Sequence, residues 1–473
     1  MILNCILLVD FGSTYTKLTV VNVDHQEILC TSKSFTTVQS GILEGYQDAL
    51  DKLSDILKKN NCTIIDRLGC SSAAGGLKMS VSGLVKQLTS EAAKLACLGS
   101  GAKILDVYSQ KMTGFDMKRL LDRNPDMILL AGGTDGGNTH CIVHNSKLLS
   151  MSGTTVPIVV AGNKSAYDII ENVFWDSGLD YRLVDNVMPE LNKIEIDSAR
   201  EAIREIFMDR IIDAKGLGAA KQLLSNEIIP TPMAVLRAAE LLSSGTDENS
   251  GWGPLMIIDI GGATTDVHSV CDGSPTRAGV MQTGLVEPYI KRTVEGDLGM
   301  RISALSLLES VGTPLLMKFT GETKTAIESK CQVLHKKHEK IPENEGEIKF
   351  DEGMAKAAVN VAVQRHVGQV ESIYSPMGML FYQKGKDLSN IRTVIGTGGV
   401  LVHSQTADKI LNECILDKQQ PELLKPLDPE YVLDESYMLS ATGLLSEKYP
   451  ELSMALMNKY LVKMGGKTDE IKK

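Results

Sequence analysis

Two stretches of this chain place carboxylates, glycines and hydroxyl groups at similar spacing. The first is Asp10–Lys17 (Asp-Phe-Gly-Ser-Thr-Tyr-Thr-Lys) and the second is Asp259–Asp266 (Asp-Ile-Gly-Gly-Ala-Thr-Thr-Asp), and an apolar run precedes each. A glycine turn between two strands directs backbone N–H groups into a concavity that binds phosphate. Mg²⁺ is commonly bound through one or two carboxylates together with phosphate oxygens. The two stretches therefore predict a site for a nucleoside triphosphate with Mg²⁺.

In the first stretch, the side chains suit both the phosphates and the metal. Gly12 allows the turn, the hydroxyl groups act as donors, and Lys17 supplies a positive charge. Asp10 could hold a water molecule on Mg²⁺. A polar hairpin turn without a ligand is the alternative, but an apolar strand normally avoids a carboxylate at its buried end. The expected nucleotide contacts here are Gly12, Ser13, Thr14, Tyr15 and Lys17.

The second stretch has two acids, Asp259 and Asp266, on either side of its turn. On a hairpin, this spacing can put both carboxylates on the same rim. One could orient or deprotonate an attacking water, and the other could coordinate the metal. Phosphoryl transfer depends mainly on positioning and charge neutralisation, so the arrangement suits hydrolysis. The expected nucleotide contacts here are Gly261, Gly262, Ala263, Thr264 and Thr265.

A third stretch, Val394–Val400, contains Gly396, Gly398 and Gly399. Glycines at a strand end let an adenine and a ribose lie against bare backbone. A turn that packs a helix explains such glycines equally well when they are considered alone. The position of the stretch, beyond the second phosphate motif, favours a nucleoside contact.

The hydrophobic pattern predicts the elements that position these residues. Strands are expected at 5–9, 18–23, 28–35, 127–131, 157–160 and 394–397, and helices at 44–59, 89–98, 197–213 and 231–243. Gly132–Asn138 follows one of these strands and indicates a functional edge, because ligands bind at the carboxyl ends of strands in α/β sheets. Residues 335–350 mix charges of both signs, and we expect a solvated insertion there rather than a binding patch.

The length of 473 residues exceeds what one hydrophobic core usually supports. The polar, glycine-containing segment 245–254 is the expected boundary between two domains. The first domain, 1–245, carries the first phosphate motif. The second domain, 246–473, carries the second phosphate motif and the glycine-rich nucleoside motif.

The composition argues against several classes of protein. A net charge of −10 disfavours a nucleic-acid surface, which needs basic patches. The nine cysteines contain no Cys-x-x-Cys pair, so neither a zinc site nor a redox dithiol is indicated. The start of the chain lacks the features of a signal peptide, and no run reaches the roughly 20 apolar residues of a membrane helix. We expect a cytoplasmic protein.

The three motifs resemble the phosphate 1, phosphate 2 and adenosine motifs of the actin, Hsp70 and sugar-kinase superfamily of ATPases. The resemblance implies an α/β fold with two actin/Hsp70-like (ribonuclease H-like) domains flanking an interdomain nucleotide cleft, and ATP and Mg²⁺ as cofactors. Among the three expected catalytic residues, it implies that Asp10 and Asp266 are metal-associated and that Asp259 orients the water. Hsp70-type ATPases have a further acid in the first domain, for which Asp135 is a candidate. The implied nucleoside contacts are Gly396, Gly398 and Gly399.

Throughout its length the chain also resembles a narrower family, the glutamate mutase accessory proteins of the MutL type. The resemblance implies an ATP-binding and ATP-hydrolysing accessory factor, a chaperone or reactivating factor for an adenosylcobalamin-dependent mutase such as glutamate mutase or an aminomutase. That enzyme would be the partner, with neither nucleic acid nor membrane involved, and a homo-oligomer is compatible with the sequence. The stretches that carry the resemblance are Asp10–Lys17, Ser72–Lys78, Ala131–Asn138, Ile258–Val267 and Thr293–Arg301.

Other activities stay open at this point. A small-molecule kinase of the same fold would use Asp259 equally well. An activator of a radical dehydratase needs clustered cysteines for an iron–sulfur centre, and the scattered cysteines argue against it. The run from Asp266 to Cys271 approaches a cobalamin-binding signature but has cysteine in place of the required glycine. We therefore expect His268 to be an ordinary strand residue.

Overall fold

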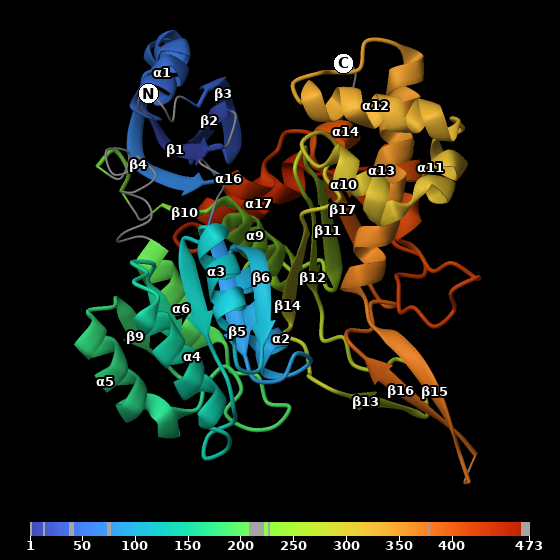
Figure 1. Ribbon diagram of the computed structural model, residues 1–473. Helices are drawn as coiled ribbons and strands as arrows, with labels where there is room; N and C mark the ends of the chain where they lie inside the picture. Colours follow the sequence, from blue (N-terminus) through green and yellow to red (C-terminus); the bar gives the residue numbers. More distant parts are fainter. Residues whose placement is uncertain are drawn as a thin grey trace. The chain divides into compact units, whose positions relative to one another are not determined.

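The computed structural model describes residues 2–12, 15–36, 42–72, 77–207, 222–225, 228–376 and 378–464 (Figure 1). The chain divides into two compact units. Unit 1 consists of Met1–Ala238, Gly284–Val286 and Ser440–Leu456, and unit 2 consists of Ala239–Thr283, Glu287–Leu439 and Met457–Lys473. Each unit is therefore built from segments that are distant in the sequence.

The first sheet of unit 1 carries the first phosphate motif and has the order β10-β4-β1-β2-β3. Strands β1, β2 and β3 form an antiparallel meander, and β4 and β10 extend the sheet in parallel on the other side of β1. These elements are β1 (Leu3–Phe11), β2 (Tyr15–Asn22), β3 (Glu27–Phe35), β4 (Cys62–Ser71), β10 (Ile229–Pro230) and the helix α1 (Ile42–Lys59) that packs on the sheet. The three expected strands and the expected helix at 44–59 are confirmed.

The main sheet of unit 2 repeats this arrangement, in the order β14-β12-β11-β17-β18-β19. Again three antiparallel strands are followed by two parallel ones. The strands are β11 (Leu255–Ile260), β12 (Thr265–Val270), β14 (Ile290–Glu295), β17 (Thr393–Thr397), β18 (Glu430–Leu433) and β19 (Val462–Lys463). This repeated order is the ribonuclease H-like arrangement, so the expected α/β class with two actin/Hsp70-like domains is confirmed.

Unit 1 contains a second, wholly parallel sheet between β4 and β10, which the sequence analysis did not anticipate. Its order, β6-β5-β7-β8-β9, is that of a doubly wound sheet. Its elements are β5 (Lys78–Gly83), α2 (Thr89–Gly99), β6 (Lys103–Ser109), α3 (Gly114–Asp122), β7 (Met127–Leu130), α4 (His140–Met151), β8 (Ile158–Val160), η2 (Lys164–Ala166), α5 (Tyr167–Ser177), β9 (Tyr181–Leu183) and α6 (Asp197–Ile206).

Alternate residues of β7 show why this sheet is covered on both faces. Met127 and Leu129 belong to the core that contains α2 and α6, whereas Ile128 and Leu130 belong to the core that contains α3, α4 and α5. A strand buried on both faces reads as a continuous apolar run. The run at 127–131 therefore predicted a strand without showing to which sheet it belongs.

The helices of unit 2 surround one long central helix, α13. It begins after Asn344, whose side chain accepts a hydrogen bond from Glu347 N, and it buries a row of small residues that allows close packing. The elements are α10 (Ala304–Val311), α11 (Thr313–Thr320), α12 (Lys324–Lys336), α13 (Glu345–His366), α14 (Gly399–Val402), α15 (Ala407–Leu411) and η4 (Asn412–Cys414), with a small sheet of β13 (Val280–Thr283), β15 (Gln369–Ser375) and β16 (Gly378–Lys384).

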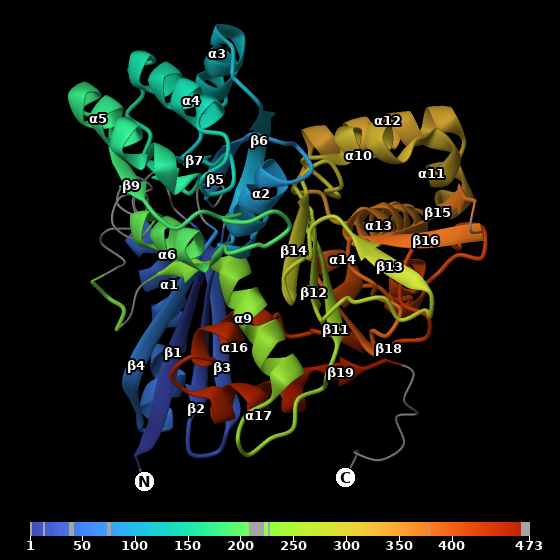
Figure 2. The ribbon, with the colours of Figure 1, turned by 90° about the horizontal axis from the view of Figure 1, so that it is seen from below.

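Three helices at the end of unit 1 lie side by side (Figure 2). They are α9 (Thr231–Ser244), α16 (Leu439–Leu445) and α17 (Pro450–Tyr460). A Cβ on Gly443 would lie 1.8 Å from the Ala234 carbonyl oxygen, so α16 approaches α9 at backbone distance. Ser453 Oγ donates to Thr442 O at 2.8 Å and joins α17 to α16. The last expected helix, 231–243, is confirmed as α9.

The buried side chain of His366, at the end of α13, forms hydrogen bonds with the main sheet of unit 2. Its Nδ1 lies 2.8 Å from Thr293 Oγ1 and its Nε2 lies 2.8 Å from Ser269 Oγ. Burial, followed by the charges of Lys291 and Lys386, lowers the pKa of His366 well below its usual range. The ring is therefore neutral in the folded protein at neutral pH.

We expect His366 to make the protein acid-sensitive. In the unfolded chain, His366 takes up a proton below about pH 6.5, whereas in the folded chain it stays neutral. The contribution of His366 to the free energy of unfolding is therefore complete above that pH and is lost as the pH falls towards the folded-state pKa. The slope for one proton is about 1.4 kcal/mol per pH unit. His366→Gln should reduce the acid slope of the unfolding free energy, measured by urea denaturation, by about that amount. Replacement of the exposed His25 by Gln is the control, and an equal slope in all three proteins would contradict the prediction.

Candidate functional site

The first phosphate motif forms a tight turn between β1 and β2. The N–H of Gly12 donates to Tyr15 O at 3.0 Å, and Asp10 lies opposite Lys17 in the antiparallel register. A Cβ on Gly12 would lie 2.6 Å from Tyr15 O. The close approach of the backbone therefore requires glycine at this position.

Asp10 is half-buried at the end of β1 and is held by three neighbouring elements. Thr231 Oγ1 of α9 donates to Asp10 Oδ1 at 2.9 Å. Cys70 Sγ of β4 and Ser440 Oγ of α16 each donate from 3.5 Å. Burial, and then the Asp10 carboxylate, raise the pKa of Cys70 well above its usual range, so the thiol stays a donor. The carboxylate has a fixed orientation in unit 1.

The remaining predicted residues of the first motif differ in their surroundings. The ring of Tyr15 stacks on Phe35 with the centroids 4.8 Å apart, which ties it to β3. Lys17 lies on β2 across from Asp10. Ser13 and Thr14 lie outside the described residues.

The second phosphate motif forms the corresponding turn between β11 and β12. The N–H of Gly261 donates to Thr264 O at 2.9 Å. Asp259 and Asp266 are direct partners in the antiparallel register, so the two carboxylates lie on one face of the sheet, as their spacing predicted. The first motif has lysine where this motif has its second acid.

Asp266 is engaged by a buried arginine that the sequence analysis did not single out. Arg292 on β14 donates from Nε and from one terminal nitrogen to Asp266 Oδ1, at 3.0 and 2.7 Å. Thr264 Oγ1 donates to Asp266 Oδ2 at 2.9 Å. The Arg292 side chain is 4% exposed. Asp266 is therefore ion-paired with Arg292, and both of its oxygens accept hydrogen bonds.

A cavity of about 640 Å³ opens beside this turn, within unit 2. The residues predicted from the sequence that line it are Asp259, Gly261, Gly262, Gly398 and Gly399. The other predicted residues of the second phosphate motif and the nucleoside motif do not line it, and they are Ala263, Thr264, Thr265, Asp266 and Gly396. The structure thus brings the second phosphate motif and the nucleoside motif to one cavity, although they are far apart in the sequence.

Two glycines of the nucleoside motif meet different constraints. Gly398 has φ +103° and a Cβ there would lie 2.3 Å from Ile260 O, so it must be glycine for the chain to pass β11. Gly396 is buried in β17, where a Cβ would meet Leu411 Cδ1 at 2.9 Å and Leu401 Cδ1 at 3.0 Å. Gly396 therefore packs a helix against the sheet, whereas Gly398 and Gly399 form the cavity wall.

The rest of the cavity lining consists mainly of residues that were not among the predicted site residues. They include Met300, Arg301, His338, Glu339, Lys340, Ile341, Pro342, Ile348, Asp351, Glu352, His403 and Ser404. The segment 335–350 was expected to be a solvated insertion, and its loop is indeed largely exposed. Residues 338–342 of this segment also line the cavity, which the sequence did not predict. The break in the charge run at Ile341–Pro342 was the available signal.

The Gly132–Asn138 edge lies at the carboxyl end of β7, in the parallel sheet. Asp135 accepts hydrogen bonds there from Asn186 Nδ2 at 2.9 Å and from Lys164 N at 3.1 Å. It thus belongs to a different sheet from Asp10.

Within the described part of the chain, no group of three or more His, Cys, Asp and Glu side chains is arranged to hold a metal ion. None of the described helices is long and apolar enough to cross a membrane.

Two comparisons of sequence give the same result. A family model described as "MutL protein" matches residues 6–461. A protein of Clostridium tetanomorphum named "Protein MutL" is 50% identical over 458 residues, which cover 97% of this chain and 99% of that protein.

Solved structures resemble this chain only distantly. The gluconate kinase of Lactobacillus acidophilus is 9% identical with a TM-score of 0.34, over 98% of this chain and 93% of that one. The Plasmodium falciparum glycerol kinase with ADP is 10% identical with a TM-score of 0.35, over 94% and 88%. The activator of the 2-hydroxyisocaproyl-CoA dehydratase from Clostridium difficile, with bound ADPNP, is 9% identical with a TM-score of 0.30, over 95% of each chain. The repeated strand order, rather than these low scores, identifies the fold.

Proposed function

The chain belongs to the MutL protein family, and we propose on this basis that it is an ATP-binding and ATP-hydrolysing accessory factor, a chaperone or reactivating factor for an adenosylcobalamin-dependent mutase. Glutamate mutase or an aminomutase would be the partner. The observation that carries the nucleotide part of the proposal is the cavity in unit 2, whose wall combines Asp259, the turn at Gly261–Gly262 and the bare backbone at Gly398–Gly399.

The cavity offers the two surfaces that a nucleotide requires. The turn at Gly261–Gly262 lacks side chains, so a phosphate oxygen can approach the backbone N–H of Gly262. The backbone at Gly398–Gly399 presents a flat surface without Cβ atoms to the nucleoside. A volume of about 640 Å³ lies in the range of pockets that enclose small ligands. Asp259, at the edge of this space, would orient the attacking water.

The carboxylates differ in how well they suit Mg²⁺. Asp10 accepts hydrogen bonds from a hydroxyl group and a thiol, and such an arrangement fits a cation bound through water. Asp266 fits less well, because Arg292 already neutralises it. In this proposal Asp10 would hold the metal, and Asp266 would keep Arg292 and the turn in place. Mg²⁺, when bound with the nucleotide, would supply charge neutralisation at the phosphates.

Binding of adenine nucleotides by the full chain tests the first step of the proposal. Isothermal titration with Mg²⁺ and ADP, or with a non-hydrolysable ATP analogue, should give saturable heat at one site per chain. Ile341→Asp would place a negative charge, like that of the phosphates, and a shorter side chain on the cavity wall. It should weaken the binding of adenine nucleotides. Absence of heat with every adenine nucleotide would refute the proposal.

The activity assays separate the proposed function from its main alternative. ATP hydrolysis that rises when an adenosylcobalamin-dependent mutase is added would support the accessory function. A phosphorylated product from a panel of small metabolites would instead identify a kinase of the same fold. A pull-down from the native host, scored for a cobalamin-dependent enzyme, would name the partner.

A further inference from the structure

The segment Gly296–Ser303 lies directly against the second phosphate turn. Its backbone N–H groups at Met300 and Arg301 donate to Gly261 O at 3.0 Å and to Gly262 O at 2.8 Å. A Cβ on Gly299 would lie 2.2 Å from the Ala263 carbonyl carbon, so the two backbones touch. The peptide groups that form the phosphate turn are therefore bonded to this segment through their carbonyl oxygens.

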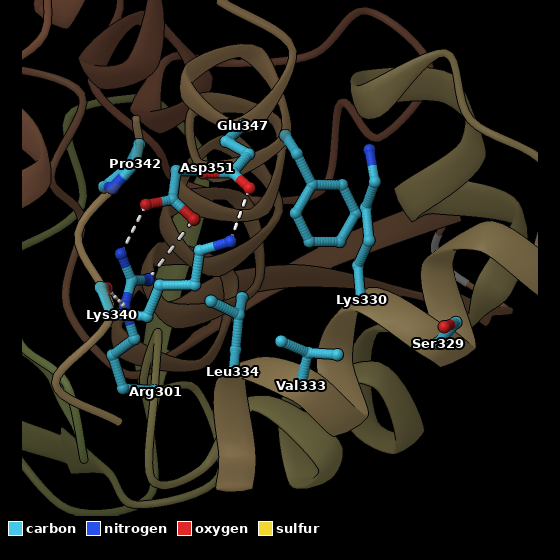
Figure 3. Close-up of a pocket in the computed structure, with 10 residues that line it drawn as sticks. Arg301, Ser329, Lys330, Val333, Leu334, Lys340, Pro342, Glu347 and Asp351 are labelled. Atoms are coloured by element: carbon cyan, nitrogen blue, oxygen red, sulfur yellow. Dashed lines mark hydrogen bonds and ion pairs between the residues drawn. The ribbon is translucent and has the colours of Figure 1, made fainter. Parts of the chain in front are cut away.

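The side chain of Arg301 extends from this segment towards Asp351 and Lys340 (Figure 3). Its two terminal nitrogens donate to Asp351 Oδ1 at 3.2 Å and to Asp351 Oδ2 at 2.5 Å, and its Nε donates to Lys340 O at 3.0 Å. Asp351 lies on α13, and Lys340 lies in the loop 338–342. The backbone of Arg301 thus contacts the phosphate turn, and its side chain contacts a helix and a loop.

The burial of this ion pair and the number of its hydrogen bonds require arginine at position 301. The side chains of Arg301 and Asp351 are 16% and 8% exposed, so the pair is largely removed from solvent. A planar guanidinium can make two parallel bonds to a carboxylate and still donate from Nε, which an ammonium cannot do. Lys340 pairs in turn with Glu347 on α13, so the loop is tied to the helix twice.

The same residues also border a second, smaller space. A cavity of about 200 Å³ lies among α12, α13 and the loop, and its lining shares Arg301, Lys340 and Asp351 with the larger cavity. Figure 3 shows Leu334 and Val333 on its other side. The ion pair therefore borders both cavities.

We propose that Arg301 is a positioning residue that couples the phosphate turn to the loop 338–342 and to α13. When the terminal phosphate occupies the turn at Gly261–Gly262, it sets the positions of Met300 and Arg301, and the bonds of the guanidinium pass this change on to the loop and the helix. The loop closes on the cavity when the terminal phosphate is present and loosens when it is lost. This inference rests on the proposed nucleotide binding and adds the means by which the two nucleotide states would differ.

Hydrogen exchange measures the coupling directly in the full chain. In the wild-type protein, the amides of 338–341 should exchange about tenfold more slowly with a non-hydrolysable ATP analogue than with ADP, a factor at the low end of typical site-to-site coupling. Arg301→Lys should bring the two rates together. Arg365→Lys is the matched control, because Arg365 binds Glu295 and Asp297 at distances of 2.6 and 2.9 Å and does not line the cavity.

Each outcome has a distinct meaning. If calorimetry shows that the wild-type protein binds neither nucleotide, the proposed function fails before the coupling is tested. If the wild-type protein binds both and Arg301→Lys keeps the wild-type difference in exchange, the coupling is refuted. A variant in which exchange rises equally in every nucleotide state would show a structural role alone and would also refute it. Asp351→Asn, which preserves the size of the side chain, should reproduce the loss if Arg301→Lys does not fold.

Discussion

Gly262→Ala should weaken the binding of adenine nucleotides by about 10- to 100-fold, because the methyl group keeps the phosphate from the turn and a hydrogen bond to a charged group contributes about 1.5–3 kcal/mol. Gly262 lines the cavity, and a Cβ there meets only Arg301 Cβ at 3.6 Å and Cγ at 3.8 Å, which are ordinary contacts. The new methyl group would therefore occupy ligand space without straining the protein. Calorimetry gives the affinity, and the thermal midpoint should be unchanged.

Other glycines of the predicted motifs cannot serve as the same probe. Alanine at Gly12 or Gly398 would collide with backbone at 2.6 and 2.3 Å, so lost binding there would have two explanations. Gly114→Ala is the control, because a Cβ at that position has nothing within 4 Å. If Gly262→Ala binds nucleotides as the wild type does, phosphates do not lie against this turn.

Asp259→Asn should lower ATP turnover by about 100- to 10,000-fold, the usual contribution of a positioned acid or base. The amide keeps the size of the carboxylate but cannot accept a proton from water. Asp259 lines the cavity at the end of β11, so the change leaves the core unaffected. Single-turnover assays with calorimetry should show retained ADP affinity together with the lost rate.

Two further variants make this result specific. Asp10→Asn should lower the turnover as well, and its loss should become smaller as Mg²⁺ is raised, because Asp10 is proposed to hold the metal. The exposed Asp272, replaced by Asn, is the control for a loss of negative charge from the same unit. Unchanged ATP hydrolysis in both Asp259→Asn and Asp10→Asn would show that Asp259 does not orient the water and that Asp10 does not hold the metal.

The sequence predicted those parts of the site that depend on neighbours along the chain. The apolar run, the aspartate and the glycines of each phosphate motif are contiguous, and an antiparallel hairpin makes Asp259 and Asp266 partners without further information. The strands and helices around them follow from the same local periodicity. The duplication of the motif also indicated two similar domains, which the repeated strand order confirms.

The missing parts depend on contacts between distant residues. Arg292 meets Asp266 because β14 pairs with β12 in a particular register, which no spacing along the chain reveals. The loop 338–342 lines the cavity because α12 and α13 bring it there, and its mixed charges resemble those of any exposed loop. The parallel sheet between β4 and β10 was hidden for a related reason, since a strand's apolar run does not identify its partners.

The return of the C-terminal segment to unit 1 has a consequence during translation. Asp66 on β4 is 2% exposed, and its carboxylate receives donors from Lys448 and from Tyr449 Oη, the latter at 2.8 Å. Its Oδ1 already has a donor in Arg67 N at 2.9 Å, but these two donors to Oδ2 lie 382 and 383 residues further along the chain, and a buried carboxylate that lacks donors is costly. A nascent chain therefore cannot complete the surroundings of Asp66 until Lys448 and Tyr449 have left the ribosome, and β4 needs protection from aggregation until then.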